Sequence, residues 1–305
     1  MKRIRKNKSK SKLKVDAILT ADWHIRESQP TCRTDDFEEA QWDMVMQVST
    51  LQQKYNCPVL HAGDLFDHWK PSPGLISKCI EKLPDNFATV YGNHDLPQHS
   101  IELARKCGIY TLGTGHHINI LEEGHEGQTP QNCNVTLPPP NDDRKIYVWH
   151  KFVYIGKPPF PGAEQEAEGH WLLDTYPQFD LILTGDNHQS FVCKEEGRLL
   201  VNAGSLTRQN ASQINYKPRV WLYNAKYNKV KPHYLKCPNG EDVISVEHLE
   251  EKKERDERIL AFVEKLDTEW EADLDFLENL KKFELQNKVD KKVMEIIYKT
   301  VEMNE

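Results

Sequence analysis

The sequence predicts an α/β fold, a layered core of strands and helices, followed by a helical extension. From residue 15 onward, short apolar runs alternate with longer stretches of helical apolar spacing, which is typical of a layered α/β domain. After about Asp242 the sequence becomes rich in Glu and Lys, with apolar residues at helical spacing. We therefore expect a basic tail at 1–14, a core domain at 15–241 and a helical extension at 242–305.

Short apolar runs predict the buried strands of the core domain. The seven runs are Val15–Ala21, Pro58–Ala62, Phe87–Tyr91, Ile146–Trp149, Leu181–Thr184, Leu199–Asn202 and Val220–Tyr223. Between the first two runs, apolar residues at 37–51 recur at helical spacing and predict a helix. Proline-containing stretches at 124–145 and 156–169 predict two long loops.

The C-terminal extension carries apolar residues three and four positions apart, which predict two or three amphipathic helices. These residues are Ile259, Phe262, Val263 and Leu266, then Phe276, Leu277 and Leu280, and then Val289, Val293, Ile296 and Ile297. Their apolar faces are expected to pack on the core domain, on each other or on a partner protein.

Charge and cysteine usage favour an intracellular protein. Residues 247–305 hold 18 acidic and 11 basic side chains, so the net charge of −7 belongs to that segment and does not exclude a nucleic-acid partner. The first fourteen residues carry eight basic side chains and no acid, without the apolar segment of a secretory signal. Seven cysteines without CxxC pairs predict a reducing compartment. No apolar run reaches the roughly 18 residues of a membrane span.

Metal-ligand side chains follow five of the predicted strands. The segments are Asp22-Trp23-His24, Gly63-Asp64, Gly92-Asn93-His94-Asp95, His150 and Gly185-Asp186-Asn187-His188. Sites in open α/β sheets form beyond the carboxyl ends of strands, so these loops are expected to converge. Oxygen and imidazole ligands without cysteine suit two divalent cations such as Mn²⁺ rather than structural zinc. A glycine before Asp64, Asn93 and Asp186 is expected to let the chain turn sharply.

This series of motifs resembles the calcineurin-like metallophosphoesterases, whose motifs run D-x-H, GD, GNH, H and GHxH. The resemblance covers roughly Val15 to Tyr223 and implies a central two-sheet β sandwich flanked by helices. Within that superfamily, the segments at 21–24, 62–67 and 202–208 are most similar to the SbcD-type DNA-repair exonucleases, including phage-encoded relatives. A cytoplasmic location in a bacterial or phage-infected cell follows from this resemblance.

The resemblance implies a role for each motif residue. Asp22, His24 and His188 would hold one metal ion, Asn93, His150 and Asp186 the other, and Asp64 would bridge both. Mn²⁺ is the expected ion, with Mg²⁺, Fe and Zn²⁺ as alternatives.

Two further residues are expected to serve the reaction without binding metal. The resemblance implies that His94 protonates the leaving oxygen or steadies the transition state, and Asp95 is expected to orient its imidazole. The family usually has His where this chain has Asp186, a substitution that adds negative charge. We therefore expect this substitution to affect catalytic efficiency more than it affects metal binding.

A phosphodiester substrate is favoured over a monoester. The resemblance places an arginine after the second motif in protein phosphatases, where it clamps a monoester, whereas His68, Trp69 and Lys70 follow Asp67 here. We expect a Mn²⁺-dependent exo- or endonuclease in DNA repair, recombination or phage DNA processing. The resemblance implies an SMC-like coiled-coil ATPase of the SbcC type as its partner, docked on the C-terminal helices, and leaves open a homodimer.

Other interpretations remain open at this point. A nucleotide phosphodiesterase or phosphatase would use the same ions on a small substrate, and a scaffold weakened by Asp186 would keep the fold without turnover. Any single motif is equally well explained by buried side chains that cap helices, but five in order favour a metal site. The basic tail either grips DNA phosphates or is simply solvated. Stacking on bases is an alternative to packing for four aromatic residues, Trp23, Trp69, Trp149 and Trp171.

Overall fold

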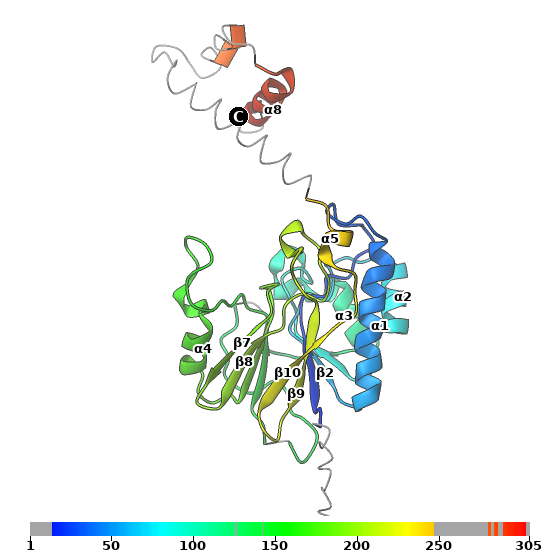
Figure 1. Cartoon of the computed structure of the whole chain (residues 1–305), viewed down its shortest axis with the longest axis vertical. Coiled ribbons are helices and arrows are strands. Elements are labelled where there is room, and N and C mark those ends of the chain that lie inside the picture. The colour runs from blue at the N-terminus through cyan, green and yellow to red at the C-terminus, as the bar shows by residue number, and fades with distance from the viewer. Residues whose placement is uncertain are drawn as a thin grey trace, which may run out of the picture. The chain divides into compact units, whose positions relative to one another are not determined.

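The computed structural model describes residues 14–125, 127–141, 143–246, 280–281, 284–285 and 289–302. The chain divides into two compact units, Met1–Ile244 and Ser245–Glu305, and each is described by itself. The first unit contains two sheets with helices on their outer faces (Figure 1). The basic tail, apart from Lys14, lies outside the described residues.

The larger sheet has six strands in the order β10-β9-β1-β2-β3-β4. Strands β1 to β4 are parallel, whereas β9 is antiparallel to both β1 and β10. The strands are β1 (Ala17–Thr20), β2 (Val59–His61), β3 (Phe87–Thr89), β4 (Asn119–Ile120), β9 (Arg219–Asn224) and β10 (Lys229–Tyr234).

The smaller sheet has four strands in the order β5-β6-β8-β7. Strands β5, β6 and β8 are parallel, and β7 pairs antiparallel with β8. Their bounds are β5 (Ile146–Trp149), β6 (Leu181–Thr184), β7 (Phe191–Glu195) and β8 (Arg198–Asn202).

Alternate side chains of the inner strands form two separate cores. Leu19 on β1 and Leu60 on β2 are buried with Val148 and Leu183 of the smaller sheet, which places one core between the sheets. The neighbouring residue Ile18 belongs to the core on the opposite face of the larger sheet. The two-residue period of a strand therefore makes this a sandwich whose strands are buried on both faces.

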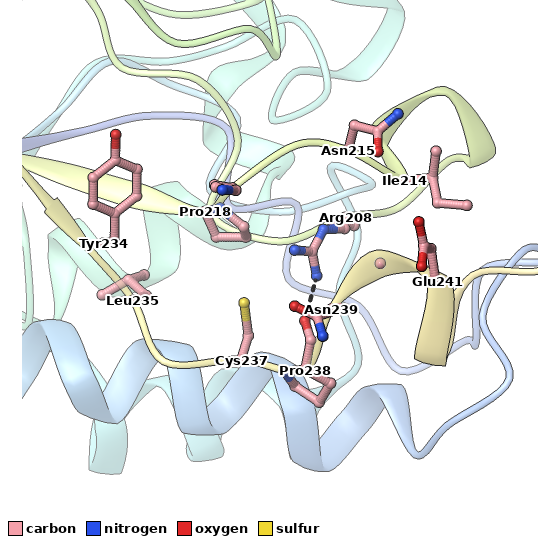
Figure 2. Close-up of a pocket in the computed structure, with 12 residues that line it drawn as sticks. Arg208, Ile214, Asn215, Pro218, Tyr234, Leu235, Cys237, Pro238, Asn239 and Glu241 are labelled. Carbon is pink, nitrogen blue, oxygen red and sulfur yellow. Dashed lines mark hydrogen bonds between the residues drawn. The ribbon is translucent and has the colours of Figure 1, made fainter.

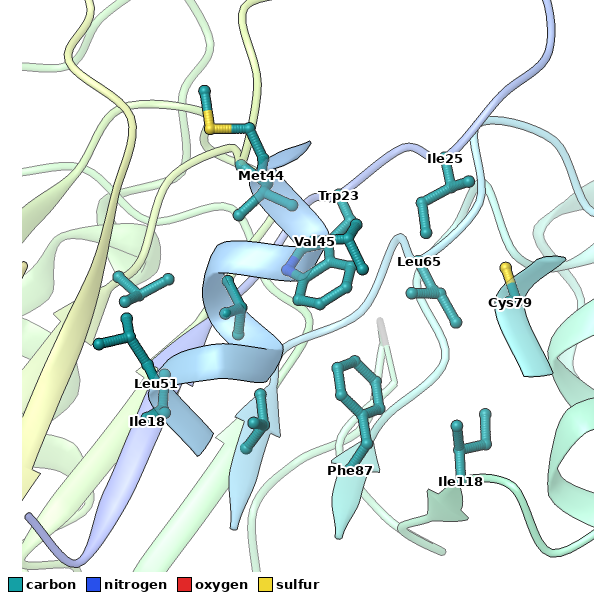
Figure 3. Close-up of a cluster of buried hydrophobic side chains, with 14 of the residues drawn as sticks. Ile18, Trp23, Ile25, Met44, Val45, Leu51, Leu65, Cys79, Phe87 and Ile118 are labelled. Carbon is teal, nitrogen blue, oxygen red and sulfur yellow. The ribbon is translucent and has the colours of Figure 1, made fainter. Parts of the chain in front are cut away.

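Helices cover the outer face of each sheet. Residues from α1 (Phe37–Tyr55) and α2 (Pro73–Lys82) pack with the outward residues of the larger sheet (Figure 3). Residues from α3 (Gly108–Thr114) belong to the same core. Residues from α4 (Gly169–Thr175) pack on the smaller sheet. The first unit also contains α5 (Gly240–Val243) and 3₁₀ turns at Pro97–His99, Ile101–Lys106, Gln165–Ala167 and Ala211–Gln213.

Capping residues fix the ends of α1, the helix predicted from residues 37–51. Asp36 accepts a hydrogen bond from the backbone N–H of Glu39 at 2.9 Å, which satisfies a donor of the first turn. Asn56 ends the helix in a left-handed conformation with φ 49°.

The predicted α/β sandwich flanked by helices is confirmed, and all seven predicted strands are present. The prediction missed three strands, β4, β7 and β10, which lie at sheet edges. Half-exposed edge strands lack a continuous apolar run, so the pattern that found the buried strands did not find these. Among the described residues, no helix is long and apolar enough to cross a membrane.

In the second unit the structure describes one of the predicted helices, α8 (Lys291–Glu302). Leu280 and Met294 are buried together, with Val289 and Ile297 partly buried against them. Ile296, expected on the apolar face, is 48% exposed. The other predicted helical positions, at 259–266 and 276–277, lie outside the described residues.

Candidate metal centre

The loops that follow β1, β2, β3, β5 and β6 meet at the carboxyl ends of these strands. The Nε2 atoms of His24 and His188, from loops of different sheets, lie 3.0 Å apart. The Nδ1 atom of His150, after β5 of the smaller sheet, donates to the carbonyl oxygen of Ala62, after β2 of the larger sheet, at 2.7 Å. This hydrogen bond is a second contact between the two sheets. The parallel strands of both sheets therefore deliver their loop residues to one cluster.

Four of the predicted site residues have left-handed backbones: Asp22 (φ 51°), His24 (φ 44°), Asp64 (φ 57°) and Asp186 (φ 70°). A residue with a Cβ adopts this conformation at a cost of roughly 1 kcal/mol or more. Hydrogen bonds between the loops hold it, for example from the N–H of His24 to the carbonyl of Asp64 at 3.0 Å. The strain places short side chains at the strand ends and is typical of functional loops.

Glycines allow the loops to approach one another. A Cβ on Gly92 would lie 2.1 Å from Oδ1 of Asp64, and one on Gly185 would lie 2.5 Å from a carbonyl oxygen. Of the three glycines expected to produce sharp turns, Gly63 alone has a positive φ, at 87°. Gly92 and Gly185 do not have a positive φ; the lack of space for a Cβ requires glycine there, and Gly92 accepts from the N–H of Asp95 at 3.2 Å at the start of a turn.

The first predicted ligand set is assembled. Potential ligand atoms of Asp22, His24 and His188 all lie within 4.8 Å of one another. Burial, with a smaller effect of the neighbouring His188, lowers the pKa of His24, and burial also lowers the pKa of His188. Both imidazoles are therefore held neutral, the form that coordinates a cation.

The second set gathers around His150. Its Nδ1 is held by a backbone carbonyl, which directs Nε2 into the cluster, and this atom lies 3.0 Å from Oδ1 of Asn93. Oδ2 of Asp64 lies 3.6 Å from Nε2 of His150 and 3.6 Å from Nε2 of His24. Asp64 thus stands between the two sets, where a bridging carboxylate is needed.

The donor set fits divalent cations. Asp22 is fully buried, and its Oδ2 has no hydrogen-bond partner among the described residues. Burial raises its pKa well above the usual value, and the negative charge of Asp64 raises it further. Buried, unpaired carboxylates are costly unless a cation offsets their charge. The cluster is therefore built for positive charge that the protein itself does not supply.

The contacts of Asp186 leave its predicted role untested. Its backbone N–H donates to Oδ1 of Asp22 at 2.9 Å. Among the described residues, its carboxylate is in none of the groups of histidines and acids that could hold a metal ion. Its place in the second ligand set therefore stays a prediction.

The expected contact between Asp95 and the imidazole of His94 is absent, so that expectation was wrong. Asp95 instead accepts hydrogen bonds from the backbone N–H groups of Leu65, Phe66 and Gly92, at 3.2, 3.0 and 3.0 Å. Burial raises its pKa although these bonds favour the carboxylate. Asp95 therefore ties two site loops together, as a positioning residue.

The imidazole of His94 is oriented by a backbone group. Its Nδ1 donates to the carbonyl oxygen of Asp67 at 2.9 Å, and its own N–H donates to Oδ1 of Asp64 at 2.9 Å. His94 is exposed, and its ring centroid lies 4.7 Å from that of His24. These contacts fix Nδ1 and leave Nε2 at the exposed edge of the cluster, where a substrate can reach it.

Sequence reasoning gave Asp67 no role, yet its side chain lies at the site. Ligand atoms of Asp67, His24 and His94 form a third group within 4.8 Å. Oδ1 of Asp67 is 3.8 Å from Nδ1 of His24, and Oδ2 is 3.0 Å from Nη1 of Arg26. Its position three residues after Asp64 was the available signal.

The remaining aromatic candidates divide into buried and exposed. Trp23 and Trp149 are 1% and 4% exposed, so packing is their role, whereas Trp171 is 37% exposed. The loop after His150 carries a further exposed ring, Phe160 at 50%, with Phe152 5.6 Å away between centroids. Trp69 is partly buried against the core of the larger sheet, so of the four predicted tryptophans Trp171 alone is exposed.

A cavity of about 380 Å³ lies elsewhere in the first unit, lined by Arg208 and residues at 214–218 and 234–241 (Figure 2). Arg208 donates from Nη1 to the carbonyl oxygen of Pro238 at 2.9 Å and closes one side. No predicted site residue lines it. Ligand chemistry, not cavity size, therefore locates the candidate centre.

Comparisons with known proteins match the part of the chain that contains these loops. A model of the calcineurin-like phosphoesterase superfamily domain matches residues 17–217, which contain every predicted ligand. The DNA double-strand break repair protein Mre11 of Haloferax volcanii is 28% identical over 169 residues. The match covers 51% of this chain and 37% of that relative, so the chain spans little more than a third of the relative's length.

Two solved structures are similar to this chain at 15% identity. One is described as a novel archaeal phosphodiesterase, with a TM-score of 0.42, and covers 72% of this chain and 99% of its own. The other is a single mutant of Vps29 from Entamoeba histolytica, with a TM-score of 0.34, and covers 73% of this chain and 99% of its own.

Proposed function

Since the chain belongs to the calcineurin-like phosphoesterase superfamily, and is thus a metal-dependent phosphoesterase, we propose that it hydrolyses phosphodiester bonds of DNA. The observation that carries the proposal is the position of Asp64, whose Oδ2 lies 3.6 Å from the imidazoles of both His24 and His150. Such a carboxylate can serve two ions at once.

We assign the ligands as two sets joined by Asp64. Asp22, His24 and His188 hold one ion, and Asn93, His150 and Asp186 hold the other. Mn²⁺ suits this mixture of oxygen and imidazole ligands. When bound, two such ions lower the pKa of a shared water and stabilise charge on the scissile phosphate.

The side chains of His94 and Asp95 serve the reaction without binding metal. His94 faces solvent with its Nδ1–H fixed on the carbonyl of Asp67, and in the imidazolium form its Nε2–H can give a proton to the leaving oxygen and leave the neutral ring. Asp95 keeps the loops of Asp64 and Asn93 in register through three backbone hydrogen bonds. Both roles require positions that the loops already have before substrate arrives.

A nucleic-acid substrate is supported by three features. The monoester-clamping arginine is missing after Asp67, an exposed phenylalanine, Phe160, follows His150 in the chain, and a relative is a DNA double-strand break repair protein. We further propose action in DNA repair, recombination or phage DNA processing in the cytoplasm of a bacterial or phage-infected cell. An SMC-like ATPase, bound through the segment 242–305, is the proposed partner.

The first test is hydrolysis of bis-(p-nitrophenyl) phosphate and of a labelled DNA duplex with Mn²⁺. We expect cleavage of both, loss of both after chelation, and recovery when Mn²⁺ is returned. Cleavage of the small ester alone would favour a nucleotide phosphodiesterase or phosphatase. A protein that binds metal and DNA and cleaves neither substrate would be a scaffold, the alternative that arises from Asp186 in place of the family's usual His.

Asp186→His is the variant that tests this last alternative. If Asp186 attenuates catalysis, restoring the imidazole typical of the family should raise kcat on bis-(p-nitrophenyl) phosphate about tenfold, with the metal content unchanged. Asp174→His, an exposed acid on α4, is the matched control. A collapse of kcat together with loss of one metal ion would instead identify Asp186 as an adapted ligand.

A further inference from the structure

We propose that Arg26 binds a DNA phosphate next to the scissile one and thereby makes the enzyme prefer polymeric diesters. The inference rests on the proposed DNA substrate and assigns a second, metal-free phosphate site beside the metal centre. Arg26 lies two residues beyond His24, in a loop whose sequence alone gave it no role.

The guanidinium of Arg26 lies at the edge of the catalytic cluster. Its Nη1 is 3.0 Å from Oδ2 of Asp67, whose other carboxylate oxygen is 3.8 Å from Nδ1 of His24. The backbone carbonyl of Asp67 also holds the imidazole of His94. One residue therefore links Arg26 to a predicted metal ligand and to the predicted proton donor.

Part of the guanidinium is free for an anion. Nε and Nη2 donate to Oγ of Ser28 at 3.0 and 2.9 Å, and Nη1 pairs with Asp67. A guanidinium has five N–H groups, so two remain without a partner among the described residues. The side chain is 25% exposed, which leaves these donors accessible. Paired N–H groups of arginine match phosphate oxygens in geometry and charge.

The backbone of Arg26 is clamped in place. Oε1 of Gln41, a side chain of α1 that is 2% exposed, accepts from the N–H of Arg26 at 3.1 Å. Nε2 of Gln41 donates back to the carbonyl of Arg26 at 2.6 Å. The preceding residue Ile25 pairs with Phe66 in a parallel bridge. With its backbone held by Gln41 and its guanidinium held by Ser28 and Asp67, Arg26 loses little conformational freedom when it binds a ligand.

A neighbouring phosphate fits this position better than the scissile one. The metal ligands and His94 already surround the scissile group, and Asp67 stands between that group and Arg26. A small ester has one phosphate and cannot occupy both places, whereas a DNA strand presents phosphates at regular intervals. Contacts to flanking phosphates position a strand without reading its sequence.

The test is the salt dependence of DNA binding by the full chain in Ca²⁺, measured by fluorescence anisotropy. Arg26→Gln removes the charge but keeps a donor for Asp67. We expect about tenfold weaker binding and a slope of log Kd against log salt that is smaller by about one. Arg26→Lys should restore the slope. Arg144→Ala is the matched control: its side chain is also 25% exposed and paired with a carboxylate, but it lies before β5, at the opposite strand ends.

Different outcomes separate this inference from the proposed function. If the unmodified chain cleaves bis-(p-nitrophenyl) phosphate but neither binds nor cleaves DNA, the proposed substrate fails. If it cleaves DNA and Arg26→Gln keeps the original salt slope, the phosphate site at Arg26 is refuted. Equal losses on DNA and on the small ester, with an unchanged slope, would show that the ion pair only neutralises Asp67. Melting temperatures of all variants identify any that do not fold, and Arg26→Lys then decides through its slope.

Discussion

Asp64→Asn is expected to abolish turnover while raising the melting temperature of the metal-free protein. The carboxylate of Asp64 lies between the two ligand sets, so its loss should lower kcat by at least about 10³-fold on any diester. Asp64 is 1% exposed and its charge helps to raise the pKa of Asp22, so the two carboxylates repel in the metal-free protein. Neutralising one of them should raise Tm by about 3 °C.

The measurement is thermal unfolding with and without Mn²⁺, together with metal content. The native chain should gain Tm on adding Mn²⁺, and Asp64→Asn should gain much less. Asp16→Asn is the control, because Asp16 is also buried but accepts from Asn141 and Ala225 just before β1, at its opposite end. It should lose Tm and keep metal binding. A variant at position 64 that binds two ions and turns over normally would contradict the bridging role.

The opposite signs expected for these two aspartates reflect how the fold is built. At the amino end of β1, the buried carboxylate of Asp16 has partners within the protein. At the carboxyl ends, Asp22 keeps one unpartnered oxygen among the described residues, and Asp22, His24, Asp64 and Asp186 have left-handed backbones. Backbone strain and unpaired charge at this one edge lower the stability of the fold, and in return they form a binding site.

The sequence was sufficient for the layers of the fold because buried strands leave continuous apolar runs. Ile146–Trp149 and Leu181–Thr184 were predicted with the bounds that the structure has. Edge strand β10 was not predicted, because its Lys229, Lys231 and Pro232 protect an exposed edge and break the apolar pattern. Its assignment depends on pairing with β9, a contact that the local sequence does not encode.

For the site, the sequence identified loops better than contacts. The order of motifs after strand ends indicated which residues would meet, because parallel strands bring their carboxyl ends together. Partners within the cluster depend on the register between loops. The carbonyl that holds His94 belongs to Asp67, 27 positions earlier in the chain, and Asp95, its neighbour in sequence, points to other amides. The position of Asp186 depends likewise on the strained turn at φ 70°.

His94→Asn is expected to keep both metal ions and lose turnover by an amount that depends on the leaving group. The imidazole is exposed and in none of the groups that contain Asp22 or Asp64, so metal content should not change. A general acid contributes about 10²- to 10⁴-fold where the leaving oxygen needs a proton. The alkoxide of DNA needs it, whereas p-nitrophenolate leaves readily. We therefore expect about a 10³-fold loss of kcat on DNA and less than about tenfold on bis-(p-nitrophenyl) phosphate.

This difference between substrates identifies what His94 does. His68→Asn is the control, because His68 is an exposed histidine of the same region whose Nδ1 accepts from the N–H of Lys70. It should leave both rates unchanged. Equal losses on both substrates in His94→Asn would assign His94 to stabilising charge on the phosphate, since that need is shared. Loss of a metal ion would make it a ligand, and undiminished cleavage of DNA would remove it from the mechanism.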